Sequence, residues 1–220
     1  MTARVAIVED HVLLAQSVGL ALRAEGLEVV RGDLSGEAEL LASLAVDAST
    51  LVLLDLDLGE PLVDGVALIP SLHKAGARVL VVTGTTDRLR IAAALDAGAV
   101  GYVGKEQPFD ELLDAILRAV DGRSVIDEGE RHELLTALRR HRAEEQRRLA
   151  PFRSLTPKET QVLDELAKGK CVESIASEWF VSEATIRTQV RGVLTKLDVR
   201  SQLAAVAKAR DVGWTATTDS

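Results

Sequence analysis

Leu51-Val52-Leu53-Leu54-Asp55 is the stretch of this sequence that decides the fold. Its four apolar residues form an unbroken run, which is typical of a strand buried on both faces of a parallel sheet. A similar run occupies residues 79–82, so two central strands are expected. Asp55 places a carboxylate at the carboxyl end of the first of them, the edge where open α/β sheets bind their ligands.

Short β-branched runs alternate with helical patterns on both sides of this stretch, from residue 3 to about residue 121. This alternation is typical of βαβ units and a parallel sheet. The expected strands are 5–8, 27–31, 51–54, 79–82 and 100–103, and the expected helices are 12–25, 36–45, 65–75, 87–96 and 109–120. The sequence therefore predicts an α/β domain over residues 1–121, with a doubly wound five-stranded parallel sheet of the flavodoxin-like type.

Residues 122–153 have a different character and are expected to form a linker helix. Within them, residues 139–148 alternate in charge sign and offer little apolar surface to bury. A pair of opposite charges four residues apart supports a solvated helix weakly. Pro151 is expected to stop this helix, because proline cannot continue the backbone hydrogen-bond ladder.

The last part of the chain is predicted to be a small all-α helix-turn-helix domain over residues 154–220. Its helices are expected at 157–168, 172–180, 183–197 and 201–210. Thr156, followed by a proline and then by Glu159, has the pattern of a capping box at a helix start. Ser182 follows a turn of the length found between the two helices of a helix-turn-helix motif. Phe180, the first residue of this turn, is expected to be a core or packing aromatic of the domain.

The net charge of −8 is unevenly distributed along the chain. Residues 1–121 carry 9 Lys and Arg against 19 Asp and Glu, whereas residues 151–220 carry 10 against 9, so the acidic balance belongs to the first part alone. Cys171 is the only cysteine, which excludes an intramolecular disulfide and a Cys-rich metal site. With no signal-peptide pattern and no apolar run near the roughly 18 residues of a membrane span, we expect a cytoplasmic protein without a membrane partner.

Three carboxylates follow strands that should meet at one edge of the sheet. Glu9 and Asp10 end the first expected strand, and Asp55 ends the third. Because like charges at close range repel, we expect that replacing Glu9 and Asp10 would relieve strain in the metal-free domain. Carboxylate oxygens suit Mg²⁺, which phosphate oxygens often complete. Thr83 and Lys105, at the ends of the fourth and fifth strands, could bind the same phosphoryl group.

These residues resemble the receiver domain of two-component response regulators. The resemblance lies in Glu9-Asp10, Leu53-Leu54-Asp55, Thr83-Gly84 and Gly101-Tyr102-Val103-Gly104-Lys105, and it covers residues 1–121. It implies Asp55 as the phospho-acceptor, Glu9 and Asp10 as Mg²⁺ ligands together with the backbone carbonyl of Asp57, Thr83 and Lys105 as phosphoryl binders, and Tyr102 as the rotameric switch.

The loop after the third strand departs from the family pattern. Gly59 stands where the family usually has Pro, and Asp64-Gly65 come two residues later than usual, so the contacts of this loop with metal and kinase are open. Asp57 is an alternative phospho-acceptor. As a second acid two residues after Asp55, it also keeps open a phosphatase of the haloacid-dehalogenase type, against which the helix-turn-helix end and Lys105 argue.

Residues 183–197 have the pattern of a recognition helix. Five apolar residues fall on one face at helical spacing: Ile186, Val190, Val193, Leu194 and Leu197. The candidate DNA contacts on the other faces are Arg187, Thr188, Arg191, Thr195 and Lys196. We expect both arginines to be free of an acid four residues away.

Residues 154–212 resemble the DNA-binding domain of LuxR/NarL-type regulators. The resemblance lies in Leu155-Thr156-Pro157-Lys158-Glu159, Ile175-Ala176 and residues 181–190. Two positions depart from the pattern, because Gln189 stands where the family commonly has His and Val172-Glu173 stand where it commonly has Asn-Lys. A negative charge thus replaces a usual phosphate contact, and we expect weaker nonspecific affinity or a reliance on dimerisation.

The two resemblances together imply a DNA-binding transcription regulator and not an enzyme. A sensor histidine kinase would phosphorylate Asp55 with Mg²⁺ as cofactor. The phosphate would alter homodimerisation and hence binding to promoter DNA, where two recognition helices imply an inverted repeat. The alternative is an orphan regulator or interaction protein of the same fold that a ligand or partner controls without phosphorylation.

Overall fold

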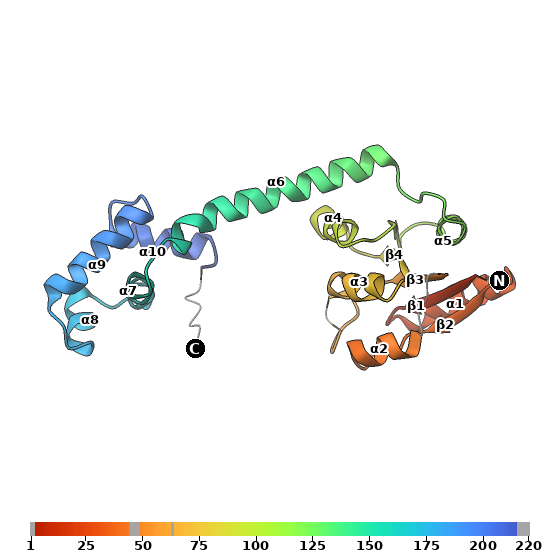
Figure 1. Cartoon of the computed structure of the whole chain (residues 1–220), viewed down its shortest axis with the longest axis horizontal. Helices are drawn as coiled ribbons and strands as arrows, with labels where there is room; N and C mark the ends of the chain where they lie inside the picture. Colours follow the sequence, from red (N-terminus) through yellow and green to blue (C-terminus); the bar gives the residue numbers. More distant parts are fainter. Residues whose placement is uncertain (1–2, 45–48, 63, 215–220) are drawn as a thin grey trace. The chain divides into compact units, whose positions relative to one another are not determined.

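The structure is a computed structural model that describes residues 3–44, 49–62 and 64–214 (Figure 1). The expected helix end at residue 45, residue 63 of the longer loop and the end of the 154–220 domain from residue 215 onward lie outside the described residues. The chain forms two compact units, Met1–Arg139 and Arg140–Ser220.

The first unit is built on a five-stranded parallel sheet, as predicted. The strands are β1 (Arg4–Val8), β2 (Glu28–Arg31), β3 (Thr50–Leu54), β4 (Arg78–Thr83) and β5 (Gly101–Gly104). Their order, β2-β1-β3-β4-β5, is the flavodoxin-like one, in which the strand order reverses between β1 and β3. β3 is buried along its whole length, as its apolar run predicts.

Helices cover both faces of this sheet (Figure 1). They are α1 (Val12–Ala24), α2 (Glu37–Leu44), α3 (Gly65–Lys74), α4 (Arg88–Asp96) and α5 (Phe109–Val120). Successive side chains of a strand point to opposite faces, and β1 shows the result. Val5 and Ile7 belong to the core formed with α1 and α5, whereas Ala6 and Val8 belong to the core formed with α2, α3 and α4.

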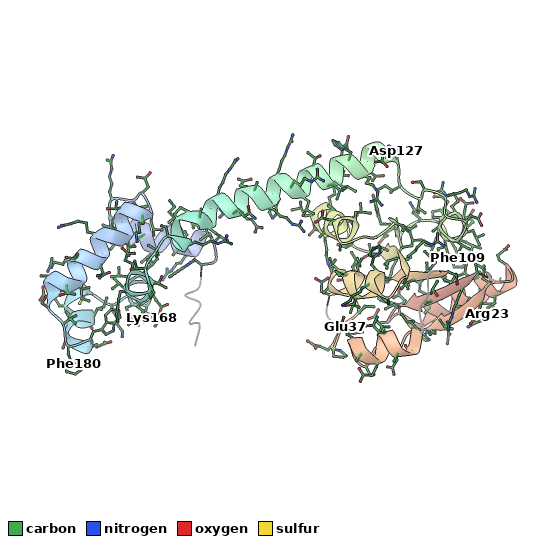
Figure 2. The ribbon with its side chains drawn as sticks, viewed as in Figure 1. Arg23, Glu37, Phe109, Asp127, Lys168 and Phe180 are labelled. Carbon is green, nitrogen blue, oxygen red and sulfur yellow. The ribbon has the colours of Figure 1, made fainter. Side chains whose placement is uncertain are left out.

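The linker helix α6 (Glu128–Arg153) begins later and is more buried than expected. Asp127 caps its first turn, since its Oδ1 accepts the amides of Gly129 at 2.8 Å and Glu130 at 3.3 Å (Figure 2). Leu134 and Leu138 are buried in the core of the first unit. These leucines, four residues apart, form an apolar stripe on the first half of α6 that the expectation of a solvated helix did not include. The expectation of little to bury was made for residues 139–148, and it is confirmed because these residues are mostly exposed.

The expected stop at Pro151 was also wrong, since α6 continues to Arg153. Proline removes one backbone hydrogen bond, a loss that is small in the last turn of a helix. Phe152 is buried in the second unit, where its ring stacks on Trp214 with centroids 5.6 Å apart, and this packing holds the final turn. Neither α6 nor any other helix in the described ranges is long and apolar enough to cross a membrane.

The second unit carries the predicted short helices. They are α7 (Pro157–Ala167), α8 (Val172–Glu178), α9 (Glu183–Lys196) and α10 (Gln202–Asp211). The capping box is confirmed, because Thr156 Oγ1 accepts the Glu159 amide at 3.3 Å and the Thr156 amide donates to Glu159 Oε2 at 2.7 Å. Ser182 caps α9 by accepting the Thr185 amide at 3.1 Å, as expected.

Phe180 lies in the turn between α8 and α9 and is 96% exposed (Figure 2). The expectation that it packs inside the domain was wrong. Its backbone is in the left-handed region, with φ 54°, where the chain reverses between the two helices. Residues before and after the turn fill the core, whereas the turn residue itself is left in solvent.

Candidate functional site

The ends of four strands bring the predicted pocket residues to one edge of the sheet. The Asp55 amide donates to the Val8 carbonyl at 2.9 Å, which extends the β1–β3 pairing by one residue and places Asp55 beside the end of β1. The Lys105 amide likewise donates to the Thr83 carbonyl at 2.9 Å. The carboxylates that follow β1 and β3 thus lie beside the hydroxyl group of Thr83 at the end of β4 and the ammonium group of Lys105 after β5.

Lys105 is the cation of this pocket. Its Nζ lies 2.7 Å from Asp55 Oδ2 and 2.6 Å from Glu9 Oε2. Burial alone would lower the pKa of Lys105, but hydrogen bonds and charges from Asp55 and Glu9 outweigh it and raise that pKa. The charged Lys105 relieves part of the carboxylate repulsion, and replacing Glu9 would leave a half-buried ammonium with one partner fewer. Because Lys105 needs Glu9 as a partner, loss of Glu9 is expected to destabilise the metal-free domain, contrary to the expectation from carboxylate repulsion alone.

The pocket fits a hard divalent cation. Potential ligand atoms of Glu9, Asp10, His11 and Asp55 all lie within 4.8 Å of one another. Asp55 is only 2% exposed, and its Oδ1 has no hydrogen-bond partner among the described residues. A buried oxygen of this kind costs free energy unless a ligand completes it, and carboxylate oxygens are what Mg²⁺ prefers.

His11 is the member of this cluster that the sequence did not identify as a site residue. It occupies the N-cap position of α1, which agrees with a helix start. Its Nδ1 also lies 3.0 Å from Glu9 Oε1 and 3.0 Å from Asp10 Oδ1. The side chain is 70% exposed, so His11 lies at the rim of the pocket and not inside it.

Arg90 of α4 holds the longer loop that follows β3. Its guanidinium group pairs with the carboxylates of Asp57 and Asp64 and donates to the Leu56 carbonyl at 2.6 Å. The Asp57 side chain is therefore engaged with Arg90, and it is not among the four residues clustered around Asp55 in the described part of the chain. Nothing in the sequence indicated Arg90, because the contact joins residues 33 apart.

Gly65 lies directly against the backbone of Asp55 and Leu56. It does so although it stands two residues later in the chain than the corresponding glycine of the family pattern. Its amide donates to the Leu56 carbonyl at 3.0 Å. A Cβ at this position would lie 2.2 Å from the Asp55 carbonyl oxygen, so only glycine fits. Asp64 before it caps α3 by accepting the Val66 amide at 3.1 Å. The Asp-Gly pair thus starts α3, and the extra residues of the loop precede it.

Thr83 and Tyr102 extend the pocket toward the linker helix. Thr83 is 1% exposed, and its Oγ1 accepts the Thr85 amide at 3.2 Å, which leaves the hydroxyl hydrogen able to donate. The Tyr102 hydroxyl donates to Glu130 of α6 at 2.6 Å. Burial and the Glu130 carboxylate raise the pKa of Tyr102 to about 12, so the phenol is protonated at neutral pH. Sequence reasoning missed Glu130, which lies 28 residues away in the chain.

Helix α9 presents most of the candidate DNA contacts to solvent. Arg187, Thr188, Arg191 and Thr195 are exposed, whereas Ile186, Val190, Val193 and Leu197 are buried as predicted. Lys196 behaves differently, since its Nζ lies 2.6 Å from the buried carboxylate of Glu159 on α7. The charge of Lys196 is thus used inside the domain.

Arg187 is not free of acids, contrary to the expectation. Its Nη2 lies 2.9 Å from Glu183 Oε2, four residues earlier on α9, and 3.3 Å from Glu173 Oε1 on α8. The hydrogen bond and charge of Glu183, with the charge of Glu173, raise the pKa of Arg187. The side chain of Arg191, one turn later, has no ion-pair or hydrogen-bond partner among the residues that the structure describes.

The pocket and the exposed helix agree with what comparison with known proteins shows. The profile of the response regulator receiver domain matches residues 5–117, just over half of the chain. The chain belongs to the two-component response regulators. The profile of bacterial regulatory proteins of the luxR family matches residues 153–209 of this response regulator. The regulator therefore combines a receiver domain with a LuxR-type DNA-binding domain, and its family is one of DNA-binding transcription regulators.

Full-length relatives support this assignment. The nitrate/nitrite response regulator protein NarP of Escherichia coli K12 is 34% identical over 207 residues, which cover 92% of each chain. The transcriptional regulatory protein LiaR of Bacillus subtilis 168 is 29% identical over 208 residues, 94% of this chain and 96% of LiaR. RcsB of Salmonella enterica serovar Typhimurium, solved on promoter P1flhDC with phosphomimetic BeF3⁻, is similar with a TM-score of 0.50 and 25% identity, over 96% of this chain and 100% of RcsB.

Proposed function

We propose that phosphorylation of Asp55 by a sensor histidine kinase switches this regulator, by changing its homodimerisation and its binding to promoter DNA in the cytoplasm. The observation that carries the proposal is the buried Asp55 Oδ1 that lacks a partner among the described residues, while Lys105 holds Oδ2. Such an oxygen has a free lone pair, so it can form a P–O bond to the phosphoryl group as the P–N bond to the kinase histidine breaks.

The remaining pocket residues have proposed roles that match their positions. Glu9, Asp10 and Asp55, with the backbone carbonyl of Asp57, would hold Mg²⁺, and Thr83 and Lys105 would bind the phosphoryl oxygens. When bound, the cation would supply positive charge against those oxygens. Lys105 already contacts the acceptor, so a second positive charge is in place for the incoming group.

Tyr102 is the proposed link between the pocket and the linker helix. If Thr83 donates its hydroxyl hydrogen to the phosphoryl group, Tyr102 would turn toward Thr83 and leave its 2.6 Å bond to Glu130. The first half of α6 is anchored by Leu134 and Leu138 and therefore stays on the receiver domain while this one contact changes. Phosphorylation would thus alter the start of the helix that leads to the DNA-binding domain.

We expect Asp10→Asn to lower Mg²⁺ affinity by about tenfold or more. Even mutation of a residue that only hydrogen-bonds to a metal ligand commonly lowers metal affinity 10- to 100-fold. Asp10 is 39% exposed and has no contact with Lys105, so the fold should persist. Titration calorimetry with MgCl₂ measures the affinity. Asp114→Asn, which removes the same charge from an exposed position of α5, is the matched control. Equal Mg²⁺ affinity in wild type and Asp10→Asn would remove Asp10 from the metal site.

The DNA-binding part of the proposal assigns contacts to Arg187, Thr188, Arg191 and Thr195 of α9. Two copies of α9, one from each protomer of a dimer, would contact the two halves of an inverted repeat.

Helix α1 has an apolar surface to which a second copy of the protein could bind. Leu13 is 80% exposed and Leu20, two turns later on the same helix, is 71% exposed. Large exposed apolar residues on one helix face favour an interface with another protein, and we assign this surface to the homodimer.

We expect Arg191→Ala to weaken binding to all DNA sequences about equally, because an exposed unpaired arginine is suited to a phosphate contact. Each lost phosphate contact should flatten the slope of log affinity against log salt by about 0.9. Fluorescence anisotropy at several salt concentrations, on a duplex selected from a random pool and on random duplex, measures both effects. Arg123→Ala, between α5 and α6 in the first unit, is the control for charge. If folded Arg187→Ala and Arg191→Ala variants both bind the selected duplex like wild type, α9 does not read DNA and the interaction-protein alternative gains.

We propose no enzymatic turnover of a separate substrate. A phosphatase of the haloacid-dehalogenase type would need a second catalytic acid at Asp57, and the ion pair with Arg90 argues against that role. The same ion pair makes Asp57 the weaker candidate for the phospho-acceptor, since its side chain is 59% exposed and already neutralised.

A further inference from the structure

Of the clustered residues Glu9, Asp10, His11 and Asp55, His11 is the one whose side chain has no role in the proposed function. Its backbone occupies the N-cap position of α1, but its side chain makes no capping hydrogen bond to that helix. The ring turns toward the pocket instead, with Nδ1 3.0 Å from Glu9 Oε1 and 3.0 Å from Asp10 Oδ1. The start of α1 therefore accounts for the backbone of His11 but not for the position of its imidazole ring.

Two contacts to the same oxygen hold this ring beside the carboxylates. The His11 amide donates to Glu9 Oε1 at 3.0 Å, and the ring Nδ1 lies 3.0 Å from that oxygen as well. Glu9 is itself fixed in place, since it is 5% exposed and its Oε2 lies 2.6 Å from Lys105 Nζ. The His11 side chain is largely exposed, yet its Nδ1 end is thus tied to a buried group.

The ligand atoms of the cluster have the separations that a small divalent cation requires. Two ligands at adjacent corners of an octahedron with metal–ligand distances of about 2.1 Å lie about 3.0 Å apart. His11 Nδ1 and Asp10 Oδ1 have this separation. On the buried side of the cluster, Asp55 Oδ1 has no hydrogen-bond partner among the described residues. The imidazole nitrogen therefore lies where it can share a cation with the oxygens of Asp10 and Asp55.

We propose that His11 is a further metal ligand, which raises the affinity of this pocket for divalent transition-metal ions relative to Mg²⁺. The inference rests on the metal site of the proposed function and concerns the class of ion that this site accepts. Mg²⁺ is bound mainly by oxygen ligands, whereas imidazole nitrogen suits ions such as Fe²⁺, Ni²⁺ and Zn²⁺. In a neutral imidazole one ring nitrogen carries no hydrogen, so Nδ1 can bind the ion while Nε2 carries the hydrogen.

The charge of the pocket does not discriminate between these ions. The carboxylates of Glu9, Asp10 and Asp55 contribute three negative charges and Lys105 one positive charge, so the net charge of −2 balances any divalent cation. Selection among divalent ions comes from ligand type and geometry. The imidazole of His11 is the nitrogen ligand of the cluster in the described part of the chain, so the preference for a transition-metal ion should depend on His11.

The test measures the affinities of the untagged full chain and of His11→Asn for Co²⁺ and for Mg²⁺ by titration calorimetry. Asparagine is a good N-cap residue, so α1 should be kept. We expect His11→Asn to lower Co²⁺ affinity by about tenfold or more, the loss that even indirect support of a metal ligand commonly carries. Mg²⁺ affinity should change by less than about threefold, because its oxygen ligands remain. His73→Asn, which removes an exposed imidazole from α3, is the matched control and should change neither affinity.

A second measurement detects the nitrogen ligand itself. In the proton NMR spectrum of the Co²⁺-bound wild type, the ring protons of one histidine should be strongly shifted by the paramagnetic ion, and these signals should be absent from His11→Asn. An equal loss of affinity for both ions, an unchanged Co²⁺ affinity, or a Co²⁺-bound wild type without shifted histidine signals would each overturn the inference and leave the metal site in place. If the wild type binds neither ion, it is the metal site of the proposed function that fails.

Discussion

Asp55→Asn is expected to abolish Mg²⁺-dependent incorporation of phosphate from acetyl phosphate or from a phosphorylated histidine kinase. The amide has nearly the same shape as the carboxylate but is not a nucleophile, so no P–O bond forms. Glu9 still holds Lys105 through its 2.6 Å contact, so the variant should keep its fold. Intact-mass measurement after incubation with the donor should show the phosphorylated species for wild type and only the unmodified mass for Asp55→Asn.

Asp57→Asn is the matched control for this experiment, because it makes the same change two residues further along. Its carboxylate pairs with Arg90, so its loss should leave phosphorylation intact. Labelling of Asp55→Asn at the wild-type level, together with loss of labelling in Asp57→Asn, would move the acceptor to Asp57. Absence of labelling in the wild type with either donor would favour the orphan regulator.

Glu159→Ala is expected to destabilise the DNA-binding domain by about 2 to 3 kcal/mol, because a buried acid that serves several partners is removed. Glu159 is 7% exposed, accepts the Thr156 amide at 2.7 Å and pairs with Lys196 at 2.6 Å. It also fills the space beside Gly192, where a Cβ would lie 2.2 Å from its Oε1. Thermal unfolding of the full chain, followed by circular dichroism, should show the transition of this domain lowered by about 10 to 20 °C.

The pH dependence of the same transition distinguishes the charge of Glu159 from its packing. Burial would raise the pKa of Glu159, but Lys196 and Thr156 outweigh it and lower that pKa. The charge therefore stabilises the domain fully above the unfolded pKa of about 4.3, and this contribution is lost as pH falls through the lower folded pKa. Glu159→Gln should lose less stability than Glu159→Ala at neutral pH and should show a weaker acid dependence. An unchanged melting temperature in both variants would contradict the role given to Glu159.

Sequence patterns were sufficient wherever a local rule fixed the outcome. Asp55 was placed correctly because an unbroken apolar run can only be a buried strand in this context, and the carboxyl ends of parallel strands share one edge. The cap formed by Thr156 and Glu159 was found for the same reason, since it depends on residues three apart. Phe180 shows the limit, because the side chain of a turn residue can face either way without a change in local pattern.

What the sequence by itself determined is therefore the order and type of elements, the edge of the sheet where the acids gather and the face of α9 that is buried. Only the tertiary structure decided how charges far apart in the chain are paired, whereas the pair of Glu183 and Arg187 lies within one helical turn and could have been predicted from the sequence. Lys105 neutralises Asp55, Arg90 engages Asp57, and Glu173 engages Arg187, each across at least 14 residues of chain. The physical reason is range: backbone patterns repeat within a few residues, whereas an ion pair depends on which distant side chains packing brings within about 4 Å. In this regulator, Lys105 engages Asp55 Oδ2, whereas Asp55 Oδ1 has no partner among the described residues. On α9, Arg187 is held by ion pairs, whereas the Arg191 side chain is free of them in the described part of the chain.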